Sequence, residues 1–213
     1  MKYLIGYSGG KDSQVALDLA LKKYENTEVF FVDSGLEFPE TLETIKKTEK
    51  FYNIEIVRLY PAKSFEEYLK DFGGFWPSPR RRWCRERLKE RPIKKYINSQ
   101  KERIRVIDGI RKYESWKRAK RQKIEMHRSG KWRIEHIVFN WREEKIFRYI
   151  AEKNLPLNPL YSLGFPRASC WLCPFASQET NNLVAKTHPE LHKYAEELKK
   201  RYGNCFTGRS KNL

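Results

Sequence analysis

A glycine-rich turn constrains the fold of this 213-residue chain more than any other feature. Residues 2–7, KYLIGY, form a short apolar run that is typical of a buried strand. The turn SGGKDS follows, and apolar side chains then recur at helical spacing over 12–24. A strand, a tight glycine turn and a helix in this order predict the first unit of an α/β fold.

Further strand and helix patterns follow along the chain. We expect strands at 27–33, 54–60 and 103–110, and a helix with proline in its first turn at 39–52. This alternation predicts parallel βαβ units with right-handed crossovers. The fold class is therefore α/β, with an open, mostly parallel, doubly wound sheet of the Rossmann-like kind. A Ser-Gly-Lys turn within 124–139 adds a predicted hairpin.

Local signals predict several helix boundaries. Ser64 and Glu67 form a capping-box pattern, which predicts a helix over 65–72. Asn140 with Glu143 predicts a cap for a helix from residue 141 to about residue 153. Gly203 is expected to end the last helix.

The charge is distributed unevenly along the chain. Residues 1–75 hold 10 Lys/Arg and 13 Asp/Glu, whereas residues 76–213 hold 34 and 14, a net charge of +20. The segments 80–95 and 111–133 are basic, and the second is interleaved with aromatic side chains. Such a pattern favours a polyanionic partner, tRNA or DNA, although a solvated, thermophile-like surface is the alternative.

The first residues lack the layout of a cleavable signal, and the apolar runs are far shorter than a membrane span. We therefore expect a cytoplasmic protein with no membrane association. In a reducing compartment, the four cysteines are expected to be ligands or reactive thiols rather than disulfides. They are Cys84, Cys170, Cys173 and Cys205.

The opening turn has the chemistry of a phosphate cradle. Gly9 and Gly10 let the backbone approach an anion, and the following helix dipole adds to the attraction. Lys11 supplies a cation, and Asp12 could hold Mg²⁺ or cap the helix. The hydroxyls of Ser8 and Ser13 can donate further bonds, and a second polar pair at a strand end is formed by Asp33 and Ser34. The spacing differs from the nucleoside-triphosphate P-loop, and a plain tight turn before a capped helix is the alternative.

The turn resembles the PP-loop, SGGxDS, of ATP pyrophosphatases, the adenine nucleotide alpha hydrolase group, which cleave ATP between the α and β phosphates. Over nearly its whole length the chain resembles the phosphoadenosine phosphosulfate reductase family. The resemblance also includes FVDSGLEFPET (31–41), WCRERLKERPI (83–93), IDGIRKYESWKRAKR (107–121) and NPLYSLGFPRASCWLCP (158–174). Dedicated sulfonucleotide reductases usually have a degraded PP-loop and a catalytic cysteine in a Glu-Cys-Gly-type motif. Here Lys11 and Asp12 are intact, and the nearest cysteine motif is GNCFTG around Cys205.

The resemblance implies a set of site residues. An adenine nucleotide, ATP or an adenylyl sulfate nucleotide, would be held by the turn together with Gly109, Arg111 and Arg118. In cluster-bearing relatives a cysteine matching Cys84 joins the Cys170-x-x-Cys173 pair, which favours a [4Fe–4S] cluster over the alternative, Zn²⁺. Cys205 is either the fourth ligand or the thiol that carries sulfur. Four reduced cysteines without metal are the plainer alternative.

These features predict a PP-loop domain over 1–155, with a basic insert at about 76–100, and a cysteine-containing helical region over 156–213 packed on it. The leading hypothesis is an ATP-dependent sulfur-transfer enzyme that adenylates and thiolates a nucleic acid, with Lys11, Asp12 and Cys205 as catalytic residues. The alternatives are a phosphoadenylyl-sulfate or adenylyl-sulfate reductase and a non-catalytic nucleotide- and nucleic-acid-binding subunit. A sulfur-donor protein or thioredoxin-like reductant and an oligomeric state are compatible with either enzyme.

Overall fold

The computed structural model describes residues 1–203. Its centre is a six-stranded sheet in the order β3-β2-β1-β4-β6-β5. Only β5 runs antiparallel, because it forms a hairpin with β6. The strands are β1 Lys2–Gly6, β2 Thr27–Val32, β3 Ile56–Leu59, β4 Ile104–Asp108, β5 Ile124–Met126 and β6 Arg133–His136. The predicted open, mostly parallel sheet is confirmed.

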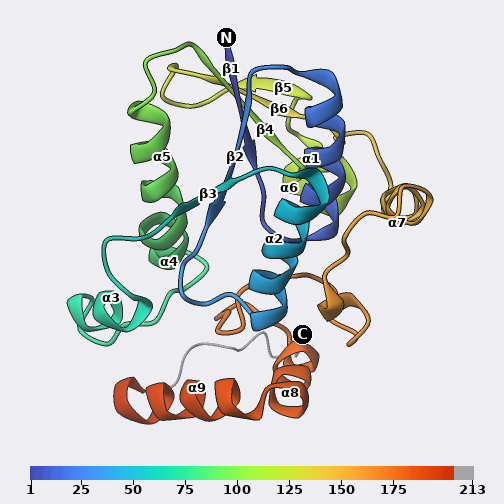
Figure 1. Ribbon diagram of the computed structural model, residues 1–213. Helices are drawn as coiled ribbons and strands as arrows, with labels where there is room; N and C mark the ends of the chain where they lie inside the picture. The colour runs from blue at the N-terminus through green and yellow to red at the C-terminus, as the bar shows by residue number, and fades with distance from the viewer. Residues whose placement is uncertain (204–213) are drawn as a thin grey trace.

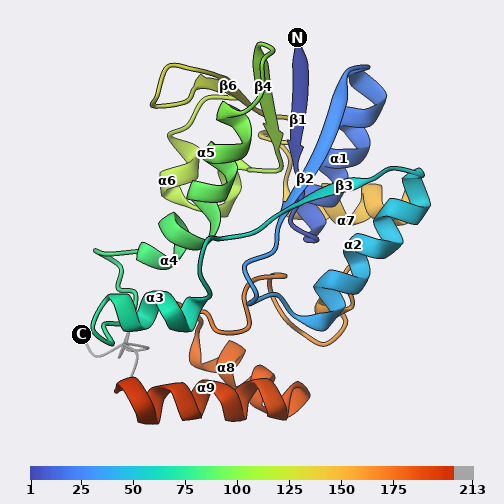
Figure 2. The ribbon, with the colours of Figure 1, turned by 60° about the vertical axis from the view of Figure 1, so that its left-hand side comes forward.

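Helices cover both faces of the sheet (Figures 1 and 2). The helices of the first part of the chain are α1 Lys11–Lys23, α2 Pro39–Tyr52, α3 Phe65–Asp71, α4 Trp83–Arg85 and α5 Arg91–Asn98. A π-helical turn, η1 Glu86–Glu90, joins α4 to α5. Those of the second part are η2 Lys112–Glu114, α6 Trp116–Ala119, α7 Glu143–Glu152, η3 Pro159–Tyr161, α8 Gln178–Thr187 and α9 Pro189–Tyr202.

Apolar side chains of the central strands divide between the two faces. Ile5 and Phe31 pack with Leu17 of α1 and Ile45 of α2. The neighbours that point the other way, such as Leu4, pack against α5. This alternation follows from the twofold side-chain period of a strand, and it explains why these runs are apolar throughout.

The last two helices belong to a separate apolar cluster. α8 and α9 lie beyond the carboxyl ends of the strands in both views (Figures 1 and 2). Their side chains pack with α3, α4 and the segment that contains Trp171. The chain therefore returns, after 160 residues, to cover the end of the sheet where the glycine turn lies.

Most predicted boundaries agree with the structure, and one is wrong. The capping box of Ser64 and Glu67 is confirmed, and Gly203 ends α9 with φ 81°. Asn140 does not cap α7, because the helix begins at Glu143 and Arg142 precedes it. Asn140 lies instead in a turn where the N–H of Trp141 donates to the carbonyl of Val138.

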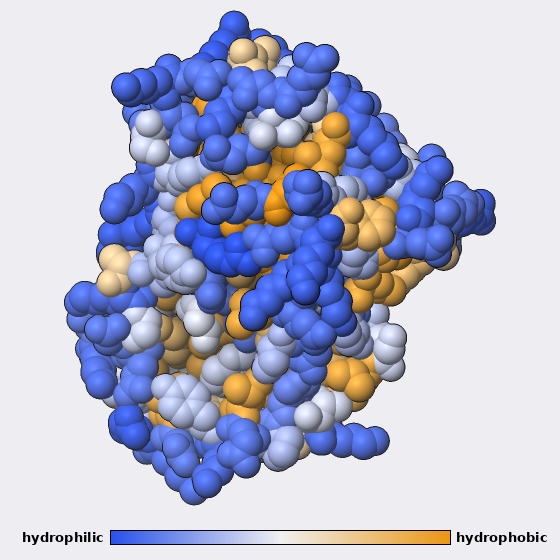
Figure 3. Space-filling view, viewed as in Figure 1, coloured by the Kyte–Doolittle hydropathy of each residue, from blue (hydrophilic) through white to orange (hydrophobic). Residues whose placement is uncertain are grey.

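Hydrophilic residues cover most of the face in Figure 3. Within residues 1–203, no helix has the length and apolar character needed to cross a membrane.

Candidate functional site

The glycine turn lies between β1 and α1, where close packing leaves no room for larger residues. Gly9 has φ +71°, and a Cβ there would lie 2.9 Å from Thr41. Gly109, at the end of β4, approaches so closely that a Cβ would lie 2.5 Å from the carbonyl oxygen of Asp12. Only glycine combines this backbone geometry with this proximity. The carboxyl ends of two adjacent strands are thereby brought against the start of α1.

A cavity of about 700 Å³ opens over this turn. It is of the size that proteins use for nucleotide-sized ligands. Predicted residues that line it are Ser8, Gly10, Lys11, Asp12, Ser13, Gly109, Arg111 and Arg118. Segments far apart in the sequence complete the wall, at the start of α7 (residues 142–144) and in the loop at 166–169.

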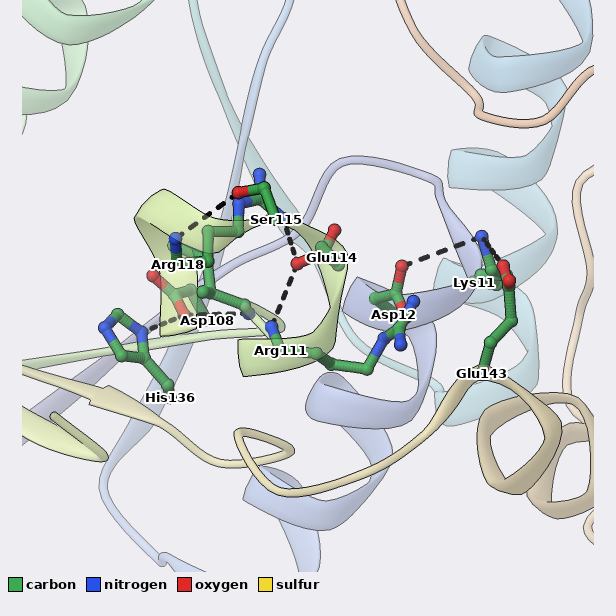
Figure 4. Close-up of polar contacts among 10 residues, drawn as sticks. Lys11, Asp12, Asp108, Arg111, Glu114, Ser115, Arg118, His136 and Glu143 are labelled. Carbon is green, nitrogen blue, oxygen red and sulfur yellow. Dashed lines mark hydrogen bonds and ion pairs between the residues drawn. The ribbon is translucent and has the colours of Figure 1, made fainter. Parts of the chain in front are cut away.

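Lys11 is a buried cation of the cavity wall. Its side chain is only 4% exposed, and its ammonium lies 2.9 Å from a carboxylate oxygen of Glu143 and 3.8 Å from one of Asp12 (Figure 4). The ring of Tyr161 lies 4.9 Å from the same nitrogen. Lys11 lowers the pKa of Glu143, chiefly through its hydrogen bond. A buried ammonium held in this way supplies a fixed positive charge beside the turn.

A second cation, Arg111, lies across from Lys11. Its Nε donates to Asp12 at 2.5 Å, and its side chain is almost fully buried. Burial raises the pKa of Asp12, and the charges of Lys11 and Arg111 oppose this effect. Glu114 accepts a bond from the N–H of Arg111 and pairs with Arg118 (Figure 4). Lys11, Arg111 and Glu114 thus act on the carboxylate of Asp12, and Arg118 holds Glu114 in place.

Two residues that sequence reasoning missed hold the turn in place. The hydroxyl of Tyr161 accepts the N–H of Lys11 at 3.0 Å. The side-chain amide of Asn158, fully buried, donates to the carbonyl of Gly9 at 3.1 Å and to Thr41. Both lie in the segment NPLYSLGF, for which the family resemblance over 158–174 was the only signal. Asp108, which lines the cavity, is similarly fixed by the buried ring of His136 at 2.5 Å.

Asp33 and Ser34 are placed beside the site rather than at the cavity wall. The carboxylate of Asp33 accepts the N–H of Gly35, and the hydroxyl of Ser34 donates to Glu37. Neither residue is among those that line the cavity. Their contact with nucleotide stays a prediction.

Three of the four cysteines converge next to the cavity. Cys84 lies in α4, while Cys170 and Cys173 precede α8, and all three are free and half-buried. Burial, and then the neighbouring Cys170, raises the pKa of Cys84 to about 11. Cys170 directly follows the cavity-lining residues 167–169 and forms a β-bridge with Glu37. The thiols are therefore adjacent to the nucleotide-sized cavity, whereas Cys205 lies outside the described residues.

The thiols and carboxylates near the cavity can be compared with the ligands that an iron–sulfur cluster and Mg²⁺ require. Within residues 1–203, no three Asp, Glu, His or Cys side chains are arranged to hold a metal ion. The three converging thiols, with Lys89 and Arg82 nearby, fit an iron–sulfur cluster in kind, because cations stabilise thiolates and offset a negative cluster. Asp12 and Glu143 offer the hard oxygens that Mg²⁺ takes when substrate phosphates complete its shell. Both metals stay predictions.

The pattern of the phosphoadenosine phosphosulfate reductase domain matches residues 2–176. The chain belongs to this family. Among its relatives is a Methanocaldococcus jannaschii protein, "Uncharacterized protein MJ0066", 36% identical over 93% of this chain and 42% of its own length. A second protein of that organism, MJ0973, is also 36% identical, over 92% of this chain and 47% of its own length. The chain thus spans less than half of these two relatives.

Other relatives of the family are named for a reaction. The adenosine 5'-phosphosulfate reductase of Anoxybacillus flavithermus is 30% identical over 89% of this chain and 83% of its own length. The phosphoadenylyl-sulfate reductase of Candida auris, solved as a phosphate complex, superposes with a TM-score of 0.66 at 23% identity, covering 81% of this chain and 83% of its own. The FMN adenylyltransferase of Candida glabrata, solved with ATP, gives 0.55 at 18% identity, covering 79% and 52%. The two structures show a shared fold.

Proposed function

We propose that this family member is an ATP-dependent sulfur-transfer enzyme that adenylates and thiolates a nucleic acid. The observation that carries the proposal is the complete GGKDS turn, with buried Lys11 and Arg111 facing one cavity. Breaking ATP between its α and β phosphates requires stabilisation of a leaving pyrophosphate. A reductase that receives an already adenylated sulfate has no such leaving group.

The geometry of the turn supports the first step of this proposal. A substrate oxygen attacks the α-phosphorus of ATP, the bond to the bridging oxygen breaks, and pyrophosphate leaves. Lys11 and Arg111 lie where they would stabilise the negative charge that develops on this group. Mg²⁺, held by Asp12 and the phosphates, would supply further charge neutralisation.

The second step requires sulfur. A persulfide on a sulfur-donor protein attacks the substrate atom that bears the adenylated oxygen. The bond to that oxygen breaks, and AMP leaves with it. A thioredoxin-like dithiol then reduces the disulfide that joins carrier and product. Cys84, Cys170 and Cys173 would hold an iron–sulfur cluster beside the cavity, where it could bind or relay sulfur, with Cys205 as fourth ligand or sulfur carrier.

A second candidate is an adenylyl-sulfate or phosphoadenylyl-sulfate reductase. It is favoured by relatives named adenosine 5'-phosphosulfate reductase, which are 28–30% identical and covered over 70% or more of their own length. In that reaction Cys205 would attack the sulfur of the sulfonucleotide and displace AMP from adenylyl sulfate, or adenosine 3',5'-bisphosphate from phosphoadenylyl sulfate. A thioredoxin-like dithiol would then release sulfite.

One assay separates the two candidates. The sulfur-transfer enzyme converts ATP to AMP and pyrophosphate with tRNA or DNA present, and Lys11→Ala abolishes this conversion. Lys22→Ala, at an exposed position of the same helix, should retain it. Sulfite release from adenylyl sulfate without ATP, lost in Cys205→Ser, would contradict the proposal and favour the reductase. Nucleic-acid binding with neither turnover would indicate a binding subunit.

The metal is tested separately. Protein purified anaerobically should show the broad visible absorption of an iron–sulfur cluster, with iron in excess of zinc. Cys84→Ser should lower the iron content, whereas zinc without iron would favour the alternative metal.

A further inference from the structure

A second, smaller cavity lies away from the nucleotide-sized one. It measures about 350 Å³ and is formed by the end of α3, the loop before α4 and the end of α9. Its wall is mainly aromatic, from Phe72, Phe75, Trp76, Trp83 and Tyr202, and Gly74, Ser78 and the cation Arg81 complete it. None of these residues lines the first cavity.

The wall is built from fixed parts. The indole N–H of Trp83 donates to the carbonyl of Phe75 at 3.0 Å, and Trp83 itself is buried. Tyr202 reaches across from α9, where its hydroxyl donates to Glu66 of α3. Arg81 belongs to a tight turn in which it exchanges backbone hydrogen bonds with Ser78. The cavity is therefore formed before anything binds to it.

The side chain of Phe75 is 73% exposed, although its aromatic neighbours in the wall are buried or half-buried. A phenylalanine this exposed at the rim of an aromatic cavity offers a flat apolar face to a ligand. The guanidinium of Arg81 lies 4.9 Å from the ring centre of Phe72, so a charged plane is also part of the wall.

The charges around the cavity restrict the ligand. Arg80, Arg81 and Arg82 are exposed, and none of them has a carboxylate within 4.0 Å among residues 1–203. A cationic ligand would be repelled by this cluster. A planar ring that carries anions on either side matches both the aromatic wall and the arginines, and an unstacked nucleobase with its flanking phosphates has that chemistry.

We propose that this aromatic cavity binds one unstacked base of a single-stranded segment, while the arginines of residues 80–82 contact the adjacent phosphates. The inference rests on the proposed function, because it supplies a binding site for the nucleic-acid substrate. Trp83 precedes Cys84, so a strand anchored here would pass beside the converging thiols.

The test compares a labelled short oligothymidylate with the same oligonucleotide in which the bases are removed and the phosphates kept. Fluorescence anisotropy without ATP measures both affinities. Stacking on an aromatic side chain changes affinity by about tenfold per base. The wild-type protein should therefore prefer the intact oligonucleotide by about tenfold, and Phe75→Ala should bind both equally.

Tyr60→Ala is the matched control, because Tyr60 is also exposed, at 62%, and does not line the cavity. It should keep the preference. Arg81→Ala should weaken both oligonucleotides and lower the salt dependence. An equal affinity of the wild type for both probes, no binding of either, or an unchanged preference in Phe75→Ala would overturn the inference. Since ATP is absent, these outcomes leave the test of ATP cleavage unaffected.

Discussion

Asp18 offers the sharpest test of how the nucleotide site is held together. Its carboxylate, only 2% exposed, lies on α1 one and a half turns beyond the glycine turn. It accepts bonds from Tyr52 of α2 at 3.0 Å, Tyr149 of α7 at 2.6 Å and Lys22 at 2.7 Å. One buried charge therefore fastens to α1 both α2, which packs against Gly9 through Thr41, and α7, which carries cavity residues. We predict that Asp18→Asn destabilises the fold.

The magnitude follows from these partners. A hydrogen bond to a charged group contributes about 1.5–3 kcal/mol, against about 1 kcal/mol between neutral groups. Two tyrosine bonds would each lose the difference, and the pair with exposed Lys22 adds less than about 1 kcal/mol. The expected loss is about 3 kcal/mol, which for a domain of this size lowers Tm by roughly 6–12 °C.

Acid titration tests the charge itself. Burial raises the pKa of Asp18, but the bonds from Lys22, Tyr149 and Tyr52 outweigh it, so the pKa lies below its usual value. A carboxyl with a lowered folded-state pKa stabilises the protein above its unfolded pKa of about 3.9, and this stability is lost as pH falls through the folded value. Asp18→Asn should therefore make the free energy of unfolding depend less on pH in this acid range.

Thermal and urea unfolding, followed by circular dichroism at neutral pH and between about pH 2 and 5, measure both effects. Lys22→Met is the control, and its Tm should fall by no more than about 4 °C. A Tm of Asp18→Asn equal to that of the wild type, or an unchanged acid profile, would refute the argument that this carboxylate is charged and anchors the helices.

Three further predictions concern the site and its surroundings. Glu143→Gln should strengthen pyrophosphate binding to Lys11 about two- to fivefold in EDTA, measured calorimetrically, because a competing carboxylate is removed; weaker binding would contradict this. Gly109→Ala should abolish nucleotide binding, since its methyl would collide with Asp12. Titration with labelled ATP measures the affinity, and an unchanged circular dichroism spectrum shows that the variant is folded. Retained affinity would contradict the close packing at Gly109. Ser64→Ala should cost about 1 kcal/mol in urea unfolding through the lost capping box, and no loss would show that the cap is dispensable.

Local patterns predicted the sheet well because its parallel strands are buried on both faces. Their apolar runs and the helix between β2 and β3 could be read directly. The sequence did not reveal that β6 pairs with β4 in parallel, because residues far apart meet there: Val106 lies opposite Ile134. Asn140 failed as a cap because it lies in a local turn, where the N–H of Trp141 donates to the carbonyl of Val138, and α7 begins only at Glu143.

The residues of the site could likewise be predicted only where they are close together in the sequence. The glycine turn is contiguous, so Lys11 and Asp12 could be found from spacing. Glu143, Asn158 and Tyr161 reach the turn from more than 130 residues away, and nothing in their local sequence fixes that distance. Only the family resemblance marked the segment 158–174, which contains Asn158 and Tyr161, as part of the site.

The pairing of charges in the cavity indicates how a nucleotide would enter. Lys11 and Arg111 already lie in buried surroundings, each beside a carboxylate, so the cost of removing these cations from water is met during folding. Phosphate oxygens would then replace Glu143 and Asp12 as partners of the cations. The displaced carboxylates need a new counterion, and a divalent cation bound to the same phosphates would provide it. We therefore predict that nucleotide binding in this site exchanges ion pairs, and that its affinity depends more strongly on Mg²⁺ than on ionic strength, because both cations are buried and weakly screened.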